Sequence, residues 1–153
     1  MDKKLYFAYG SNLNLDQMKS RCPDHEVLTH HTLKNFRLLF RSVADIEEHS
    51  GSRVQGVIFK ISKEDEESLD IYEGVPKLYS KKYFTLKLDK MEASVLYYKM
   101  NVSGIGKPTD NYYNSILKGY KQNNLDINLL KQSLEFSIQN TKQPIFFSNR
   151  WKD

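Results

Sequence analysis

The sequence predicts a single α+β domain in which a small mixed β-sheet, curled or closed like a barrel, is surrounded by helices. The 153 residues are enough for one domain with its own core, so we assign residues 1–153 to one unit. The chain has no internal repeat, linker or low-complexity stretch. Strand-like runs come first, with one helix inserted among them, and helix-like runs follow, an order typical of α+β domains.

The first elements are expected to be a strand and a short helix. Residues 3–9 form an apolar run that stops at Gly10, as in a buried strand. Ser11 and Asn12 are both good helix caps, and a short helix is expected to continue from them through residue 21.

A polar loop is expected to separate the strands that follow. Apolar patterning favours strands over residues 27–33 and 36–43, and again over residues 54–61. Residues 46–52 lie between them, are mostly polar and contain a glycine, which is typical of a loop. We therefore expect three separate strands in this region.

The hydrophobic period becomes that of a helix after the third of these strands. Ser62 is followed three residues later by Asp65, which resembles a capping box at a helix start. Apolar side chains then recur at helical spacing until Gly74 and Pro76, which together end the helix.

A hairpin and two helices are expected to complete the domain. Residues 84–88 alternate between apolar and polar, and a short turn at 89–92 leads to a second strand over 94–100. After a loop, apolar stripes predict helices over residues 110–122 and 126–140.

Composition and charge exclude several classes of protein. The net charge is +4, but the basic residues are scattered and no nucleic-acid-binding motif accompanies them. No run approaches the roughly 18 apolar residues that cross a membrane, and the short apolar N-terminal run does not resemble a secretory leader. The single Cys22 cannot form an internal disulfide, which agrees with a reducing compartment. We therefore expect a cytoplasmic protein that binds neither nucleic acid nor membrane.

Residues 9–12, with the sequence Tyr-Gly-Ser-Asn, form the sharpest motif. They lie between the first strand and the first helix, where a glycine lets the backbone approach a ligand closely. The N–H groups at a helix start lack partners within the helix and favour negative charge. Such a loop can hold a carboxylate or the oxyanion of an acyl transfer. Taken alone, these four residues fit an ordinary capped turn slightly better.

Glu73 is the candidate acid-base residue. It lies at the end of the predicted helix beside an apolar turn. A carboxylate at a helix C-terminus faces the unfavourable end of the dipole, and apolar neighbours remove water from it. Both effects raise the pKa of a carboxyl group toward neutrality, where it exchanges protons readily. The alternative interpretation is that Glu73 is a solvated surface residue, as most glutamates are.

Three segments together resemble the gamma-glutamylcyclotransferase family. The run YFAYGSNL at residues 6–13 resembles the opening of that family, and LDIYEGV at residues 69–75 is similar to the segment that carries its catalytic glutamate. Residues 108–119 resemble the segment with a pocket tyrosine, with Tyr112 in register. Because the three matches occur in the expected order over residues 4–120, they are far more specific than any one motif.

The resemblance implies an enzyme that cyclises a γ-glutamyl group to 5-oxoproline and releases an amine or amino acid. Because the substrate's own α-amine is the nucleophile, the chain would need no cofactor, metal, serine or cysteine, and Glu73 would act as general base and then acid. The residues expected to bind this small-molecule substrate are Tyr9, Gly10, Ser11, Asn12, Leu13, Tyr79 and Tyr112. The resemblance also implies a closed or nearly closed sheet with helices around it.

Two features differ from the family pattern. The spacing from Glu73 to Tyr79 is one residue shorter than in vertebrate members. Asn12 follows Ser11 here, whereas the corresponding segment of the glutathione-specific relatives resembles Tyr-Gly-Ser-Leu. This difference argues against glutathione as the dedicated substrate.

Other functions stay open at the level of sequence. One alternative is a non-catalytic protein that binds a small metabolite on the same fold, and another is a cyclotransferase of secondary metabolism. Cys22 is expected to be a buried thiol rather than a nucleophile. The four histidines lack the spacing of a metal site.

Overall fold

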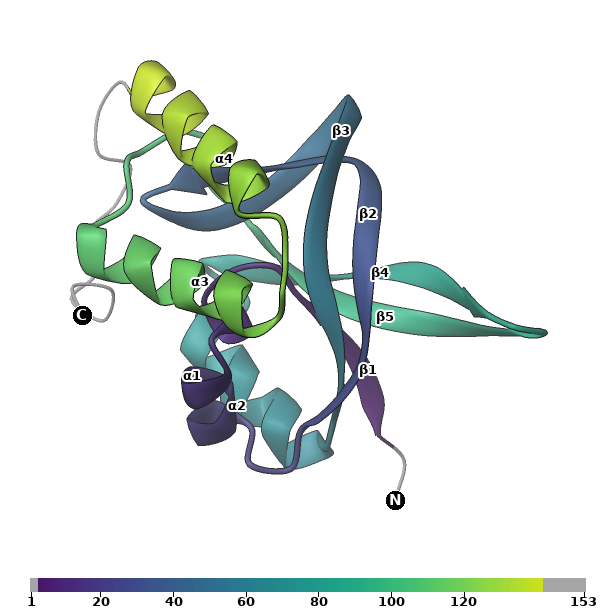
Figure 1. The fold of residues 1–153 in the computed structure, drawn as a ribbon. Helices are drawn as coiled ribbons and strands as arrows, with labels where there is room; N and C mark the ends of the chain where they lie inside the picture. The colour runs from purple at the N-terminus through teal and green to yellow at the C-terminus, as the bar shows by residue number, and fades with distance from the viewer. Residues whose placement is uncertain (1–2, 142–153) are drawn as a thin grey trace.

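A computed structural model describes residues 3–141, in which one five-stranded sheet packs with four α-helices (Figure 1). The strand order is β2-β3-β1-β5-β4. β1 and β5 are parallel and the other neighbours are antiparallel, so the sheet is mixed, as predicted. Because β2 and β4 are its two edges, the sheet stays open rather than closing into a barrel. The strands are β1 (Lys4–Ala8), β2 (Glu26–Arg41), β3 (Val43–Ile61), β4 (Tyr79–Leu88) and β5 (Met91–Met100).

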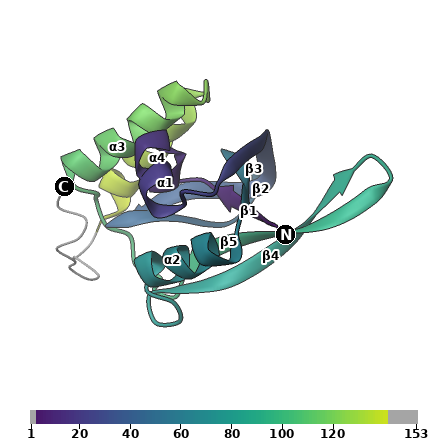
Figure 2. The ribbon, with the colours of Figure 1, turned by 90° about the horizontal axis from the view of Figure 1, so that it is seen from below.

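The helices gather at one end of the sheet, and the β4–β5 hairpin extends away from them on the opposite side (Figures 1 and 2). The two C-terminal helices lie where the sequence predicts them. The helical segments are the 3-10 turn η1 (Ser11–Leu13), α1 (Leu15–Arg21), α2 (Lys63–Glu73), α3 (Asp110–Gln122) and α4 (Ile127–Asn140).

The longest feature of the sheet is the β2–β3 hairpin, which corrects two sequence predictions. The separate strands predicted over 27–33 and 36–43 merge into one strand, β2, with an irregularity at Asn35, whose φ is 63°. β2 ends at Arg41, so the predicted end at residue 43 is wrong, because Val43 already belongs to β3. The loop predicted at residues 46–52 is wrong, because these residues belong to β3. Much of this stretch is exposed. Its polar side chains therefore reflect exposure to water rather than an absence of strand pairing.

The start of the first helix also differs from the prediction. Ser11 and Asn12 do not cap α1 but form η1, and the cap is Asn14. The Asn14 Oδ1 atom accepts hydrogen bonds from the amides of Asp16 and Gln17, at 3.1 and 3.2 Å. Ser11 and Asn12 are both buried, so their side chains are available for contacts inside the molecule.

Helix α2 begins and ends as predicted. The Asp65 amide donates to Ser62 Oγ at 3.1 Å and the Ser62 amide donates to Asp65 Oδ2 at 3.2 Å, which completes the capping box. Gly74 adopts the left-handed conformation with φ of 67°, and its amide closes the last turn on Ile71. Glu73 is therefore the last helical residue.

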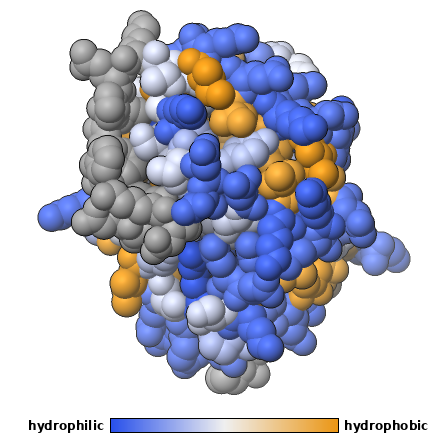
Figure 3. All heavy atoms as spheres, turned by 60° about the vertical axis from the view of Figure 1, so that its left-hand side comes forward, coloured by the Kyte–Doolittle hydropathy of each residue, from blue (hydrophilic) through white to orange (hydrophobic). Residues whose placement is uncertain are grey.

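The core lies between the sheet and the helices. Its largest fully buried side chains include Phe7, Phe40, Phe59, Met18 and Tyr120. The face in Figure 3 is mainly hydrophilic, with hydrophobic side chains in small separate patches. No helix among residues 3–141 is both long and apolar enough to cross a membrane.

Candidate active site

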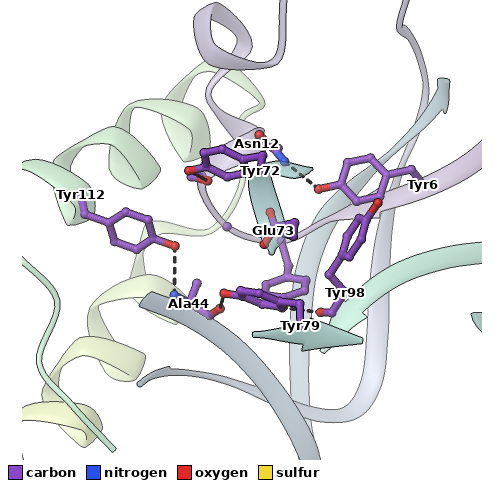
Figure 4. Close-up of a pocket in the computed structure, with 11 residues that line it drawn as sticks. Tyr6, Asn12, Ala44, Tyr72, Glu73, Tyr79, Tyr98 and Tyr112 are labelled. Atoms are coloured by element: carbon purple, nitrogen blue, oxygen red, sulfur yellow. Dashed lines mark hydrogen bonds between the residues drawn. The ribbon is translucent and has the colours of Figure 1, made fainter. Parts of the chain in front are cut away.

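A polar cavity lies where the end of β1, η1, the start of β3, the end of α2 and the first turn of α3 meet (Figure 4). About 360 Å³ of space that no atom fills lies among its lining residues, and part of this space is open to solvent. Eleven residues line it: Tyr6, Tyr9, Gly10, Ser11, Asn12, Ala44, Tyr72, Glu73, Tyr79, Tyr98 and Tyr112.

Glu73 lies in the middle of this cavity, between tyrosine side chains that come from different elements (Figure 4). Only 8% of the residue is exposed, so it is not the solvated surface glutamate that is usual. Its position follows from the sequence, because the left-handed Gly74 ends α2 immediately after it.

The phenols around Glu73 remain protonated at neutral pH. Burial is the largest cause that raises the pKa of Tyr6 and of Tyr79, and the negative charge of Glu73 is the second. Burial also raises the pKa of Tyr9, with the charges of Asp45 and Glu73 as further causes. The cavity therefore contains one carboxylate surrounded by neutral hydroxyl groups.

Tyr79 and Tyr112 meet at the backbone of Ala44. The Tyr79 hydroxyl donates to the Ala44 carbonyl oxygen at 2.7 Å. The Ala44 amide donates to the Tyr112 hydroxyl oxygen at 2.9 Å. Both tyrosines are buried, and both line the cavity, so the structure brings together two residues that are distant in sequence.

A buried ionic cluster fixes the segment that carries Ala44. Asp45 is fully buried, and its Oδ2 atom accepts from Arg41 Nε and Lys99 Nζ, each at 2.7 Å. Arg41 also donates to the Ser103 carbonyl in the loop before α3, at 2.7 Å. The cluster therefore ties the start of β3 to the end of β5 and to the loop that leads to Tyr112.

The glycine loop contributes four of its five predicted site residues to the cavity. Tyr9, Gly10, Ser11 and Asn12 line it. Leu13 does not: its side chain is fully buried, and its backbone lies against Gly119 of α3, so the structure does not support a contact with substrate.

The backbone amides of Ser11 and Asn12 are potential donors toward the cavity. Among the hydrogen bonds described for residues 3–141, none is donated by the backbone N–H of Ser11 or of Asn12. The first amides of a helical turn lack partners within it, and here they border the cavity. Amides in this position can donate to an anionic oxygen.

Four lining residues were not predicted from the sequence: Tyr6, Ala44, Tyr72 and Tyr98. Tyr6 and Tyr98 belong to strands and give the pattern of ordinary core aromatics. Tyr72 could have been found, because it directly precedes Glu73 in the matched segment. Ala44 carries no side-chain signal and acts only through its backbone.

The other reactive groups lie outside the cavity. Cys22 is a fully buried thiol, as expected, and burial is the first cause that raises its pKa to about 12. It does not line the cavity. Among the described residues no three His, Cys, Asp or Glu side chains are grouped closely enough to hold a metal ion.

The comparisons with known proteins agree with this fold. The family model described as gamma-glutamyl cyclotransferase, AIG2-like, matches residues 6–119. This chain therefore belongs to that family, and the resemblance seen in the sequence is confirmed.

Relatives that bear the gamma-glutamylcyclotransferase name match most of the chain. It is 30% identical over 142 residues to a gamma-glutamylcyclotransferase of Bos taurus, and the aligned region covers 84% of this chain and 76% of the relative. It is 29% identical over 140 residues to a gamma-glutamylcyclotransferase of Homo sapiens, with 80% and 73% covered.

Solved structures confirm the fold. A gamma-glutamyl cyclotransferase structure superposes with a TM-score of 0.75 at 24% identity, and covers 97% of this chain and 93% of its own. An AIG2-like protein of Mus musculus gives a TM-score of 0.56 at 14% identity, with 68% and 81% covered. At these identities the likeness establishes architecture alone.

Proposed function

We propose that the protein is a gamma-glutamylcyclotransferase that converts a γ-glutamyl amine or amino acid into 5-oxoproline and the free amine, with Glu73 as its acid-base residue. The observation that carries the proposal is the position of Glu73. It is a buried carboxylate in a cavity otherwise lined by neutral hydroxyls, amides and an open glycine loop.

The reaction needs proton transfer more than an external nucleophile. The α-amine of the substrate attacks its own γ-carbonyl carbon, a C–N bond forms, and the bond from that carbon to the leaving nitrogen breaks. Holding the substrate in a folded conformation makes this attack intramolecular, which is worth several kcal/mol. The α-ammonium must lose one proton before attack and a second, to solvent, once the C–N bond has formed, and the leaving nitrogen must gain one to depart as an amine. Glu73 takes the first proton and returns it to the leaving nitrogen.

The neighbours of Glu73 suit the other requirements of this reaction. The amides of Ser11 and Asn12 are placed to hold the substrate carboxylate or the developing oxyanion. Tyr79 donates its proton to Ala44, so its oxygen is left to accept from the substrate amine. Tyr112 accepts from Ala44, so its proton is left to donate to a substrate oxygen.

A substrate panel tests the proposal. The purified protein is incubated with γ-glutamyl amino acids, γ-glutamyl amines and glutathione, and 5-oxoproline is measured by mass spectrometry. Matched controls are α-glutamyl isomers, in which the γ-carbonyl is a free carboxylate, and N-acetylated γ-glutamyl compounds, in which the amine is blocked. We expect 5-oxoproline from some of the unblocked γ-glutamyl compounds and none from the two sets of controls.

If the folded protein releases no 5-oxoproline from any compound of the panel, this activity is rejected. A rise in the thermal midpoint with a γ-glutamyl compound or with 5-oxoproline would then favour the non-catalytic binding protein. Activity only on γ-glutamyl groups carried by larger molecules would favour the secondary-metabolism alternative.

A further inference from the structure

Arg21 does not line the cavity, yet it contacts two residues that do. It is the last residue of α1, and its guanidinium carbon lies 3.6 Å from the centre of the Tyr72 ring, in a cation–π contact. Its Nη1 atom donates a short hydrogen bond of 2.5 Å to Asn12 Oδ1. Arg21 therefore joins α1 to η1 and to the last turn of α2, which ends at Glu73.

The contact with Arg21 determines which way the Asn12 amide faces. A guanidinium group has only donors, so it can meet only the oxygen of an amide side chain. With its oxygen turned to Arg21, Asn12 presents its NH₂ group to the Tyr6 hydroxyl, to which it donates at 2.9 Å. Without a donor at position 21, nothing in this pair distinguishes the oxygen from the nitrogen.

The orientation of Asn12 in turn sets the role of Tyr6. Because the Tyr6 oxygen accepts from Asn12, its own proton is left to point elsewhere. Tyr6 borders the same cavity as Glu73, and the hydroxyl end of its ring faces the cavity in Figure 4. Burial and the charge of Glu73 raise the pKa of the Tyr6 phenol, so it keeps its proton and can donate a hydrogen bond throughout the neutral range.

We propose that Arg21 is a positioning residue, which acts through the Asn12 amide to make Tyr6 a hydrogen-bond donor toward Glu73. The role rests on the proposed function, because it concerns the charge of the proposed base. A hydrogen bond donated to a carboxylate favours its ionised form. The relay from Arg21 to Asn12 to Tyr6 would thus keep Glu73 ready to accept a proton from the substrate ammonium.

The kinetic test compares pH profiles of kcat/KM for three single variants and one double variant. Tyr6→Phe removes the donor, and Arg21→Met removes the guanidinium while keeping an unbranched stem. Each should move the acid limb of the profile to higher pH. Because both act on one relay, the double variant should show the shift of Tyr6→Phe alone. Arg21→Lys retains a charged group that can only donate, so it should recover much of the wild-type profile.

Arg37 provides a matched control. Its guanidinium also lies over an aromatic ring, that of Phe136, at 4.2 Å, but neither residue lines the cavity. Arg37→Met should leave the acid limb unchanged even if the thermal midpoint falls. An unshifted acid limb in Arg21→Met would overturn the relay, and so would shifts that simply add in the double variant.

A second readout needs no substrate. In ¹⁵N-labelled protein, the Asn12 side-chain NH₂ protons should show a through-space contact with the Tyr6 ring. This contact should weaken in Arg21→Met, and it should persist in Arg21→Lys and Arg37→Met. A contact unchanged in Arg21→Met refutes the proposed arrangement, whether or not the protein is active. Failure of the substrate panel alone would refute the cyclotransferase activity and leave this measurement to decide the orientation of Asn12.

Discussion

Tyr79 and Tyr112 bind opposite polar groups of one residue, Ala44. Tyr79 donates to its carbonyl oxygen at 2.7 Å, and Tyr112 accepts from its amide at 2.9 Å. The same backbone thereby orients two hydroxyls in opposite senses, so that one is left to accept and the other to donate. Two tyrosines that look equivalent in the sequence consequently have different tasks in the proposed reaction.

This asymmetry predicts different effects for the two phenylalanine variants. Tyr112→Phe removes a donor to a substrate oxygen whose charge grows during the reaction, so kcat should fall by about 10². Tyr79→Phe removes an acceptor for the substrate amine, so KM should rise more than kcat falls. Steady-state kinetics on the best compound of the panel separates the two. Equal effects on kcat and KM in both variants would show that the hydroxyls are not differentiated.

Gly10 is predicted to be limited by its contact with Ala44. A Cβ atom at Gly10 would lie 3.0 Å from the Ala44 Cβ atom and 3.9 Å from the Tyr112 hydroxyl. Gly10→Ala should therefore displace the residue that holds both tyrosines, and turnover should fall by roughly 10- to 100-fold with little loss of stability. Gly10→Val should be more severe.

A compensating change tests this explanation. Ala44→Gly removes the atom that would collide with the new side chain, so Gly10→Ala combined with Ala44→Gly should recover much of the lost turnover. If the double variant is no better than Gly10→Ala, the loss has another cause, such as a direct collision with substrate.

The buried tyrosines predict a loss of stability at alkaline pH. The pKa values of Tyr6, Tyr9 and Tyr79 are all raised well above the usual value in the folded protein, first by burial. In the unfolded chain these phenols ionise near about pH 10. Above that pH the unfolded state therefore binds fewer protons than the folded state, and the free energy of unfolding falls as pH rises.

Denaturant unfolding from about pH 8 to about pH 11 measures this effect. Phenolate absorbance from the buried tyrosines should appear together with unfolding. Tyr79→Phe should make the decline less steep, because one linked group is removed. Ionisation of these phenols near pH 10 in a protein that remains folded would contradict their burial.

Local signals in the sequence were sufficient for α2 and for the position of Glu73. The capping box of Ser62 and Asp65 and the stop at Gly74 act within a few residues, so they can be recognised without tertiary structure. The β2–β3 hairpin was predicted less well, because its exposed polar residues satisfy both a loop pattern and a solvent-facing strand.

The rest of the site depends on contacts between distant segments. Ala44 has no functional side chain, and its part in the cavity arises only when β3, β4 and α3 converge on it. Tyr6 gives the periodicity of a core residue, and only the Asn12 amide beside it indicates a polar role. Family resemblance supplied Tyr79 and Tyr112, but it also included Leu13, which folding directs into the core.

Glu73→Gln is the most direct test of the proposed mechanism. Glutamine keeps the size and hydrogen-bonding capacity of glutamate but cannot exchange a proton at neutral pH. Turnover should fall by roughly 10² to 10⁴, the usual contribution of general acid-base catalysis. Substrate binding should change little, and stability should hold or rise slightly, because the substitution removes a charge from a helix C-terminus and from a buried site.

Glu66→Gln is the matched control on the same helix. Glu66 is also buried, but it forms ion pairs with Lys4 and Lys81 and does not line the cavity. Its substitution should lower the thermal midpoint and leave turnover of the remaining folded protein near normal. The measurement is therefore the turnover and thermal midpoint of both variants side by side. A folded Glu73→Gln protein with near-normal turnover would end the proposal that this carboxylate transfers the proton.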